Sequence, residues 1–187
     1  YYTQAQIKQI IQYADDRGII VVPEFDLPAH AVSWLVSHPE LASAPGPYHL
    51  YTRFGGKNPA FDPSNPETYR FLDRFFKEMA GLFPAPWIHI GGDENSGKQW
   101  DNNPVIQAYM QPSITSDEAL QTQFIQKLAA MIHADGKQII GWDEILQPGL
   151  DKGAIIQSWR GKDSLYQAAR EGHRTILSNG YYLDLLY

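Results

Sequence analysis

The sequence contains no cysteine, no long apolar run and no cluster of basic residues. Without cysteine, disulfide bonds and thiolate metal sites are excluded, but the compartment stays open because many exported proteins also lack cysteine. No apolar stretch reaches the roughly 18 residues that a membrane span needs. A formal net charge of −6 without runs of Lys or Arg argues against nucleic acid or an anionic membrane as the main partner.

The 187 residues have the composition of one globular domain, with 43% hydrophobic and 19% charged residues. Aromatic residues are plentiful at 13%, and five of them are tryptophans. Tryptophan fills cores, but it also forms flat apolar walls against which ligand rings pack. The chain opens directly on a helix-capping sequence at Thr3, so we expect it to be a piece of a longer protein.

Helical and strand patterns alternate along the chain. The predicted helices cover residues 4–17, 66–83, 117–136 and 164–171, and the predicted strands cover 19–22, 87–91, 138–142, 154–159 and 174–178. A long segment rich in Pro and Gly, about residues 38–65, separates the first strand from the second helix. Regular alternation of this kind predicts an α/β fold built from parallel βα units.

Polar and aromatic residues follow the carboxyl end of nearly every predicted strand. They are Glu24, Asp26 and His30; Asp93 and Glu94; Trp142, Asp143 and Glu144; Trp159 and Arg160; Tyr182 and Asp184. A (β/α)8 barrel builds its active site at that edge, whereas an open doubly wound sheet concentrates its ligand groups at one switch point. The even spread favours a (β/α)8 TIM barrel. Five strands make an incomplete one, so we expect residues 1–187 to form a partial barrel domain.

The strand at 87–91 ends in Gly91-Gly92, which Asp93 and Glu94 follow immediately. Neighbouring side chains of an extended strand point to opposite faces, so the two acids can serve one pocket only if the backbone turns at the glycines. The alternative is an exposed acid pair that simply opens a loop. Acids beside aromatic walls fit glycoside hydrolysis, in which a carboxylic acid protonates the leaving oxygen.

Other hydrolytic chemistries have weaker support. Glu24, Asp26, His30 and Asp93 could ligate a divalent ion, but no HExxH or His-x-His spacing is present, and we expect neither a metal nor a cofactor. A serine hydrolase is disfavoured because the sequence has no G-x-S-x-G motif.

Five strand-end motifs, in this order, carry a family resemblance: Pro23–His30, His89–Glu94, Trp142–Glu144, Ser158–Gly161 and Tyr182–Asp184. Together they resemble the catalytic domain of glycoside hydrolase family 20, the β-N-acetylhexosaminidases, over essentially the whole chain. The resemblance implies a (β/α)8 barrel of which this chain holds about strands 3 to 7. It also implies an exo-acting enzyme that removes terminal β-linked N-acetylglucosamine or N-acetylgalactosamine from a glycan or glycoside, retaining configuration.

In this family the 2-acetamido oxygen of the sugar attacks the anomeric carbon, so the enzyme supplies no nucleophile. The resemblance implies that Glu94 is the general acid and then the base. It implies that Asp93 accepts the acetamido N–H and stabilises the charge of the oxazolinium-like intermediate. Because vicinal carboxylates repel, we expect one of the two to be protonated near neutral pH.

The resemblance assigns substrate contacts to four further residues. Trp142 and Trp159 would be walls of the acetamido pocket, Tyr182 would donate its hydroxyl to the acetamido carbonyl, and Asp184 would bind sugar hydroxyls. His30 would support the general acid without touching substrate. The remaining candidate neighbours of the site are Glu24, Asp26, His89, Asp143 and Glu144.

The chain departs from the family pattern in places. The family's arginine on the first barrel strand, the acid on the second, and the tryptophan and glutamate on the last are not among these residues. Ala29 and Asn95 stand where Gly and a small apolar residue are frequent. A non-catalytic carbohydrate-binding barrel, an inactive fragment of an active enzyme and a metal-dependent barrel hydrolase therefore stay open as alternatives. Export or a periplasmic location is an expectation from the family alone.

Overall fold

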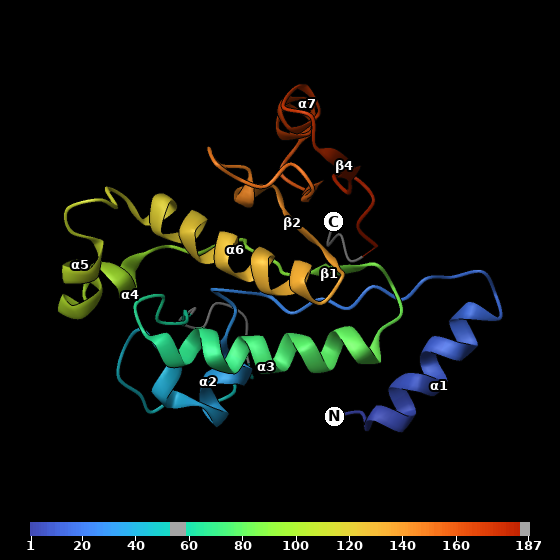
Figure 1. The fold of residues 1–187 in the computed structure, drawn as a ribbon, viewed down its shortest axis with the longest axis horizontal. Coiled ribbons are helices and arrows are strands. Elements are labelled where there is room, and N and C mark those ends of the chain that lie inside the picture. Colours follow the sequence, from blue (N-terminus) through green and yellow to red (C-terminus); the bar gives the residue numbers. More distant parts are fainter. Residues whose placement is uncertain (53–58, 184–187) are drawn as a thin grey trace.

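The computed structural model describes residues 1–52 and 59–183 (Figure 1). Its sheet has four parallel strands, β1 (Trp87–His89), β2 (Gln138–Trp142), β3 (Ile155–Ser158) and β4 (Arg174–Leu177). The strands lie side by side in chain order. A doubly wound sheet reverses its strand order at a switch point, whereas a βα barrel does not. The order therefore agrees with a partial barrel.

The strand predicted at 19–22 is wrong, because its residues form no strand and two of them, Ile19 and Ile20, are 58% and 61% exposed. The chain joins the sheet a few residues later. Phe25 N donates to His89 O and His89 N donates to Pro23 O, both at 2.9 Å. Leu27 N continues this pairing by donating to Ile90 O at 3.0 Å, and its side chain, in contrast to those of Ile19 and Ile20, is fully buried in the core. A strand forms only where backbone pairing and burial coincide, and at residues 19–22 they do not.

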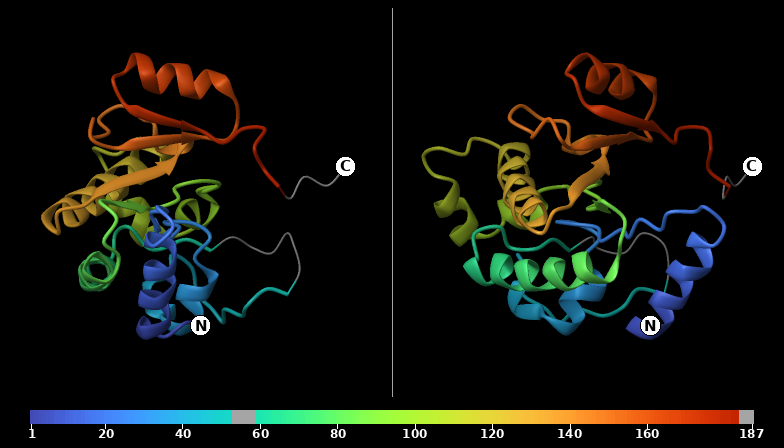
Figure 2. Two further views of the ribbon diagram at one scale, coloured as in Figure 1. Left: turned by 90° about the vertical axis from the view of Figure 1, so that its right-hand side faces the viewer. Right: turned by 45° about the vertical axis from the view of Figure 1, so that its right-hand side comes forward.

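Helices cover one face of the sheet (Figure 2). Helix α3 (Pro66–Leu82) packs on α6 (Asp117–Ala134), α6 packs on β2, and α7 (Lys162–Arg170) packs on β3 and β4. Helix α1 (Gln4–Asp15) begins at the Thr3 capping box. Except for the strand at 19–22, the predicted helices and strands are confirmed to within about two residues at each end. No helix in the described part of the chain is long and apolar enough to cross a bilayer.

Short helices interrupt segments that the sequence pattern leaves as loops. They are α2 (Val32–Ser37), α4 (Lys98–Asp101), α5 (Pro104–Met110) and the 3-10 turns η1 (Pro39–Leu41) and η2 (Asp143–Ile145). The signal for α5 was present, since Asn103-Pro104 repeats the Asn65-Pro66 pattern that begins α3. Both asparagines cap their helix with the side-chain oxygen.

Two apolar clusters hold the chain on either side of the loop that follows β1. The larger lies between the sheet and α3 and α6, and its fully buried members include Leu72, Phe76, Ile88, Ile90, Phe124, Leu128, Ile139 and Ile156. The smaller surrounds Trp100 of α4, whose Nε1 donates to Phe61 O at 3.0 Å. The loop carrying Asp93 and Glu94 is thus anchored at both ends by packed side chains.

Candidate active site

The backbone turns sharply after β1, as the paired glycines predict. Gly91 and Gly92 have φ of 68° and 99°, and Glu94 has φ of 51°. A Cβ on Gly91 would lie 1.8 Å from Asp26 Oδ1, and one on Gly92 would lie 2.3 Å from Ile145 Cγ2. Only glycine satisfies both the left-handed φ and the close approach. The turn brings Asp93 and Glu94 to the same pocket.

That pocket has a volume of about 580 Å³, within the usual range for small-ligand sites. Its lining is formed by Glu24, Asp26, His30, Asp93, Glu94, Trp142, Trp159, Asn179, Gly180 and Tyr182. The structure therefore brings together the two predicted catalytic acids, His30, both tryptophans and Tyr182. Of the further candidate neighbours, Glu24 and Asp26 line the pocket, whereas His89, Asp143 and Glu144 do not. Asp184 lies outside the described residues.

His30 lies between the two acids. Its Nε2 is 3.1 Å from Glu94 Oε2 and 3.4 Å from Asp93 Oδ2. His30 and Glu94 both have a φ of 51°, which is uncommon for residues with a side chain and is concentrated at functional sites. The imidazole is placed to contact either carboxylate, which fits the supporting position expected for His30.

Asp26 and Asp93 form a close carboxyl pair. Burial and the neighbouring Asp93 carboxylate raise the pKa of Asp26 to about 8, although the Gly92 N–H, 3.2 Å from Asp26 Oδ1, opposes this. Asp26 is therefore mainly protonated at pH 7 and can donate to Asp93. Asp93 Oδ1 is buried and has no hydrogen-bond partner among the described residues. The acid with the raised pKa is therefore Asp26, which lies 67 positions from Asp93. The expectation that Asp93 or Glu94 carries a proton stays a prediction.

Trp142 and Trp159 both line the pocket and lie edge to face beside each other, with 6.5 Å between ring centroids and an interplanar angle of 70°. The indole Nε1 of Trp142 donates to Glu24 Oε1 at 3.1 Å. The indole Nε1 of Trp159 donates to Glu144 Oε2 at 3.0 Å. Each tryptophan is thus oriented by a glutamate from a different strand end.

The imidazole ring of His89 packs edge to face against the indole ring of Trp142, with ring centroids 4.9 Å apart. Burial lowers the pKa of His89 to about 4, so the ring is neutral at pH 7. Its Nδ1 accepts the Gly91 N–H at 3.1 Å. The 3.4 Å approach of Nδ1 to Glu24 is consequently not an ion pair.

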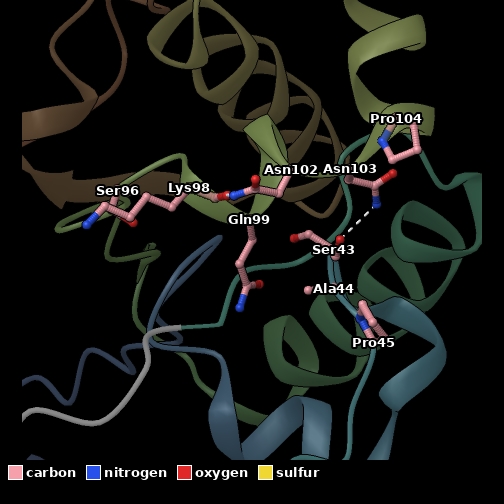
Figure 3. Close-up of a pocket in the computed structure, with 9 residues that line it drawn as sticks. All are labelled: Ser43, Ala44, Pro45, Ser96, Lys98, Gln99, Asn102, Asn103 and Pro104. Carbon is pink, nitrogen blue, oxygen red and sulfur yellow. Dashed lines mark hydrogen bonds between the residues drawn. The ribbon is translucent and has the colours of Figure 1, made fainter.

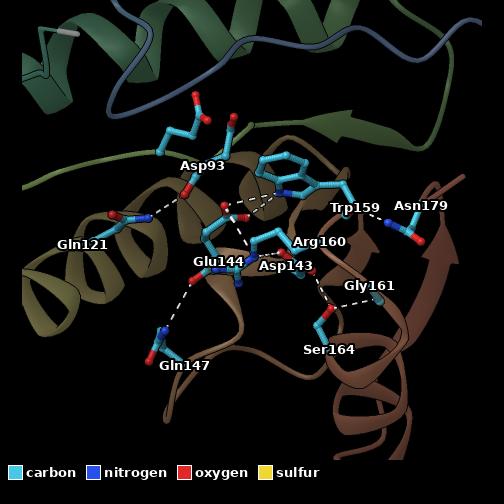
Figure 4. A network of polar contacts seen from close by, with 12 residues as sticks. Asp93, Gln121, Asp143, Glu144, Gln147, Trp159, Arg160, Gly161, Ser164 and Asn179 are labelled. Atoms are coloured by element: carbon cyan, nitrogen blue, oxygen red, sulfur yellow. Dashed lines mark hydrogen bonds and ion pairs between the residues drawn. The ribbon is translucent and has the colours of Figure 1, made fainter. Parts of the chain in front are cut away.

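A polar network connects the ends of β2 and β3 (Figure 4). Arg160 Nε donates to Asp143 Oδ1 at 2.7 Å, and Ser164 Oγ donates to Asp143 Oδ2. The side chain of Asp143 is fully buried. A buried carboxylate needs such partners, so Asp143 is held in a structural role and does not line the pocket.

The structure separates two adjacent tyrosines that the sequence cannot distinguish. Tyr182 lines the pocket and is 39% exposed, whereas Tyr181 is 75% exposed and is not among the lining residues. Tyr182 is therefore the tyrosine positioned to reach a ligand.

A larger pocket of about 740 Å³ lies between segments 43–45 and 96–104 (Figure 3). Asn103 Nδ2 donates to Ser43 O at 2.8 Å at its edge. It contains none of the predicted site residues and no aromatic wall. We therefore place the candidate active site in the pocket of about 580 Å³, which contains the acids, the histidine and the tryptophans.

Asp26, His30 and Asp93 are the residues here that could hold a metal ion, since each offers one ligand atom within 4.8 Å of the others. Two carboxylates and one imidazole suit several divalent ions. The same three groups already contact one another or Glu94 in the arrangement described above. A metal-free site stays a prediction.

A parallel sheet in chain order, with acids, a histidine and tryptophans at its carboxyl edge, is the arrangement on which barrel-type glycoside hydrolases build their active sites. Residues 1–187 match the sequence model of glycosyl hydrolase family 20, catalytic domain. The chain therefore belongs to this family.

Relatives and solved structures carry the same family identity. The chain is 38% identical over 188 residues to a beta-hexosaminidase of Porphyromonas gingivalis, covering 98% of this chain and 24% of that protein. It is 38% identical over 197 residues to the human beta-hexosaminidase subunit beta, covering 99% and 34%. The structure of Flavobacterium johnsoniae chitobiase superposes with a TM-score of 0.94 at 46% identity, covering 100% of this chain and 30% of that one.

A Vibrio harveyi exo beta-N-acetylglucosaminidase, solved with N-acetylglucosamine, superposes with a TM-score of 0.85 at 32% identity. That match covers 96% of this chain and 29% of the other. The chain thus spans about a quarter to a third of the length of these relatives.

Proposed function

We propose that the protein to which this chain belongs is an exo-acting β-N-acetylhexosaminidase that retains anomeric configuration through the 2-acetamido group of its substrate. The observation that carries the proposal is the shared pocket of Asp93, Glu94, Trp142 and Trp159, in which both acids and both indoles are lining residues. The names of the relatives and the N-acetylglucosamine bound in the Vibrio harveyi enzyme support this substrate class.

Glu94 acts first as the general acid. Its carboxyl donates a proton to the glycosidic oxygen while the bond to the anomeric carbon breaks. The carboxylate that remains then takes a proton from the water that attacks the intermediate. His30, 3.1 Å from Glu94 Oε2, steadies the carboxyl through both steps.

Asp93 aims the nucleophile that the substrate provides. Its carboxylate accepts the acetamido N–H, so the acetamido oxygen points at the anomeric carbon and closes an oxazolinium ring. The negative charge on Asp93 stabilises the positive charge that develops in that ring. The raised pKa of Asp26 supports this role, because a protonated Asp26 places no second negative charge beside Asp93 and can donate to it.

The tryptophans enclose the acetamido group. Trp142 and Trp159 provide apolar faces for its methyl group and exclude water from the reacting oxygen. Tyr182 donates its hydroxyl to the acetamido carbonyl, and Asp184 binds sugar hydroxyls in this proposal.

Glu94→Gln tests the general acid in the full-length protein. We expect kcat for an aryl N-acetyl-β-glucosaminide with a poorly acidic phenol to fall by about 10²- to 10⁴-fold, because proton donation is lost. Glu67→Gln, on the exposed surface of α3, is the matched control and should be unaffected. Equal activity in wild type and Glu94→Gln would contradict the assignment.

Two product assays complete this test. Proton NMR of the released sugar should show the β-anomer first, and a polymeric substrate should yield only monosaccharide at early times. Both are run after exhaustive chelation, which would inactivate a metal-dependent hydrolase. An α-anomer or internal cleavage would overturn retention or exo action.

A further inference from the structure

Each tryptophan of the pocket is paired with a glutamate that no catalytic step above uses. Glu24 comes from the segment beside β1 and reaches Trp142 at the end of β2. Glu144 follows β2 and reaches Trp159 at the end of β3, with contacts of 3.0 and 3.3 Å from its two oxygens. The same arrangement, an indole N–H that donates to a carboxylate from another strand end, occurs twice around the pocket.

An indole ring needs such a restraint to serve as a wall. Rotation about the second side-chain dihedral of Trp is broad, so packing on one face leaves the tilt of the ring weakly determined. A hydrogen bond from Nε1 to a fixed oxygen sets which edge faces the pocket. A carboxylate is a stronger acceptor than a neutral oxygen, and its bond is shorter.

The two glutamates are themselves held in place. The side chain of Glu144 is 18% exposed, and its Oε1 lies 3.7 Å from Nε of Arg160, which is bound to buried Asp143. The side chain of Glu24 is 44% exposed and adjoins His89. Burial raises the pKa of both carboxyls, while the indole N–H in each case opposes the rise. The protein thus keeps two partly desolvated acids, each of which accepts an indole N–H.

We propose that Glu24 and Glu144 are positioning residues, which set the tilt of Trp142 and Trp159 and thereby the width of the pocket for the N-acyl group of the sugar. This inference rests on the proposed function for the identity of the ligand. The hydrogen bonds and their effect on the indoles can be measured without it.

The test uses full-length protein with ¹⁵N-labelled tryptophan, its indole resonances assigned with Trp142→Phe and Trp159→Phe. Glu144→Leu removes the acceptor at similar size, and Glu144→Gln keeps an acceptor oxygen. We expect the indole proton of Trp159 to move upfield and exchange faster with solvent in Glu144→Leu, and to stay near its wild-type values in Glu144→Gln. Glu24→Leu and Glu24→Gln should do the same to Trp142 alone.

Kinetics provide the second readout. We expect kcat/KM for an aryl N-acetyl-β-glucosaminide to fall by about 10-fold or more in each Leu variant and to recover most of that loss in the Gln variant, because an unpaired indole N–H is costly. We also expect the preference for N-acetyl over N-propanoyl substrate to shrink in the Leu variants. A general loss of stability would lower kcat/KM for both substrates by the same factor and leave the preference unchanged.

The outcomes separate the two proposals. Unchanged indole resonances and an unchanged acyl preference in the Leu variants would overturn the positioning role. If the Leu variants show the expected indole changes but the wild-type protein turns over no N-acetylhexosaminide, the proposed function is contradicted and the positioning role is not. If a Leu variant does not fold, the wild-type protein and the Gln variants decide the question. Slow solvent exchange of both indole protons in these proteins would support the positioning role, and fast exchange in the wild-type protein would contradict it.

Discussion

Two Asp-Glu dipeptides follow neighbouring strands of the sheet, and their surroundings differ. Asp93-Glu94 after β1 contacts His30 and lies beside the protonated Asp26. Asp143-Glu144 after β2 is bound by Arg160, and Ser164 donates to Asp143. A buried carboxylate that accepts from a guanidinium and a hydroxyl is held in one position, whereas acids that line a pocket beside a histidine can reach a substrate. The side chains that contact each dipeptide, rather than its sequence, therefore distinguish a catalytic acid pair from a structural one.

The largest difference is expected between Asp93→Asn and Asp143→Asn. Asp93→Asn should lower kcat by on the order of two powers of ten, because it removes the orienting acceptor and its charge. Its thermal stability should stay close to wild type. Steady-state kinetics on an aryl N-acetyl-β-glucosaminide measure the effect, and a loss of less than fivefold would contradict the role of Asp93.

Asp143→Asn should show the reverse pattern. Replacing a buried carboxylate that accepts from Arg160 and Ser164 should lower the free energy of unfolding by about 1–3 kcal/mol, since a charged acceptor is lost in the interior. We expect kcat to change by less than about tenfold. Urea unfolding measures the stability. A kcat loss as large as that of Asp93→Asn would erase the distinction between the two dipeptides.

The pH dependence should report Asp26. Because its pKa is raised to about 8 from 3.8, the folded protein keeps this proton as pH rises from about 4 to about 8, while the unfolded chain has lost it. Its contribution to the free energy of unfolding therefore decreases with rising pH over that window. Activity should also fall as pH rises through about 8, because Asp26 then loses its donor and gains a charge beside Asp93.

Asp26→Asn is the matched variant for this effect. Its amide keeps a donor toward Asp93 but does not titrate, so the alkaline decline should move or disappear while activity near pH 6 is largely kept. A pH–rate profile of both proteins checks this. The same alkaline limb in wild type and Asp26→Asn would assign the titration to another group.

Much of this arrangement could be predicted from the sequence because it is local. The glycine turn before Asp93 and the polar residues at each strand end follow from patterns within a few positions. The strand at 19–22 failed because an apolar run becomes a strand only where a neighbour pairs with it, and the pairing with His89 begins at Pro23. Tertiary contact outweighs local propensity there.

The electrostatic details depend on residues far apart in the chain. The raised pKa of Asp26 arises from burial and from a carboxylate 67 positions away, and the glutamate that orients Trp142 lies 118 positions from it. No spacing rule links such residues. The distinction between Tyr181 and Tyr182 likewise required knowing which side chain turns toward the pocket.

The central claim is that Asp93 aims a nucleophile supplied by the substrate. The most direct measurement compares turnover of matched aryl β-glycosides with and without the 2-acetamido group, in wild type and in Asp93→Asn. Wild type should strongly prefer the acetamido substrate, and Asp93→Asn should lose most of that preference. Comparable turnover of both substrates by the wild-type protein would contradict the account.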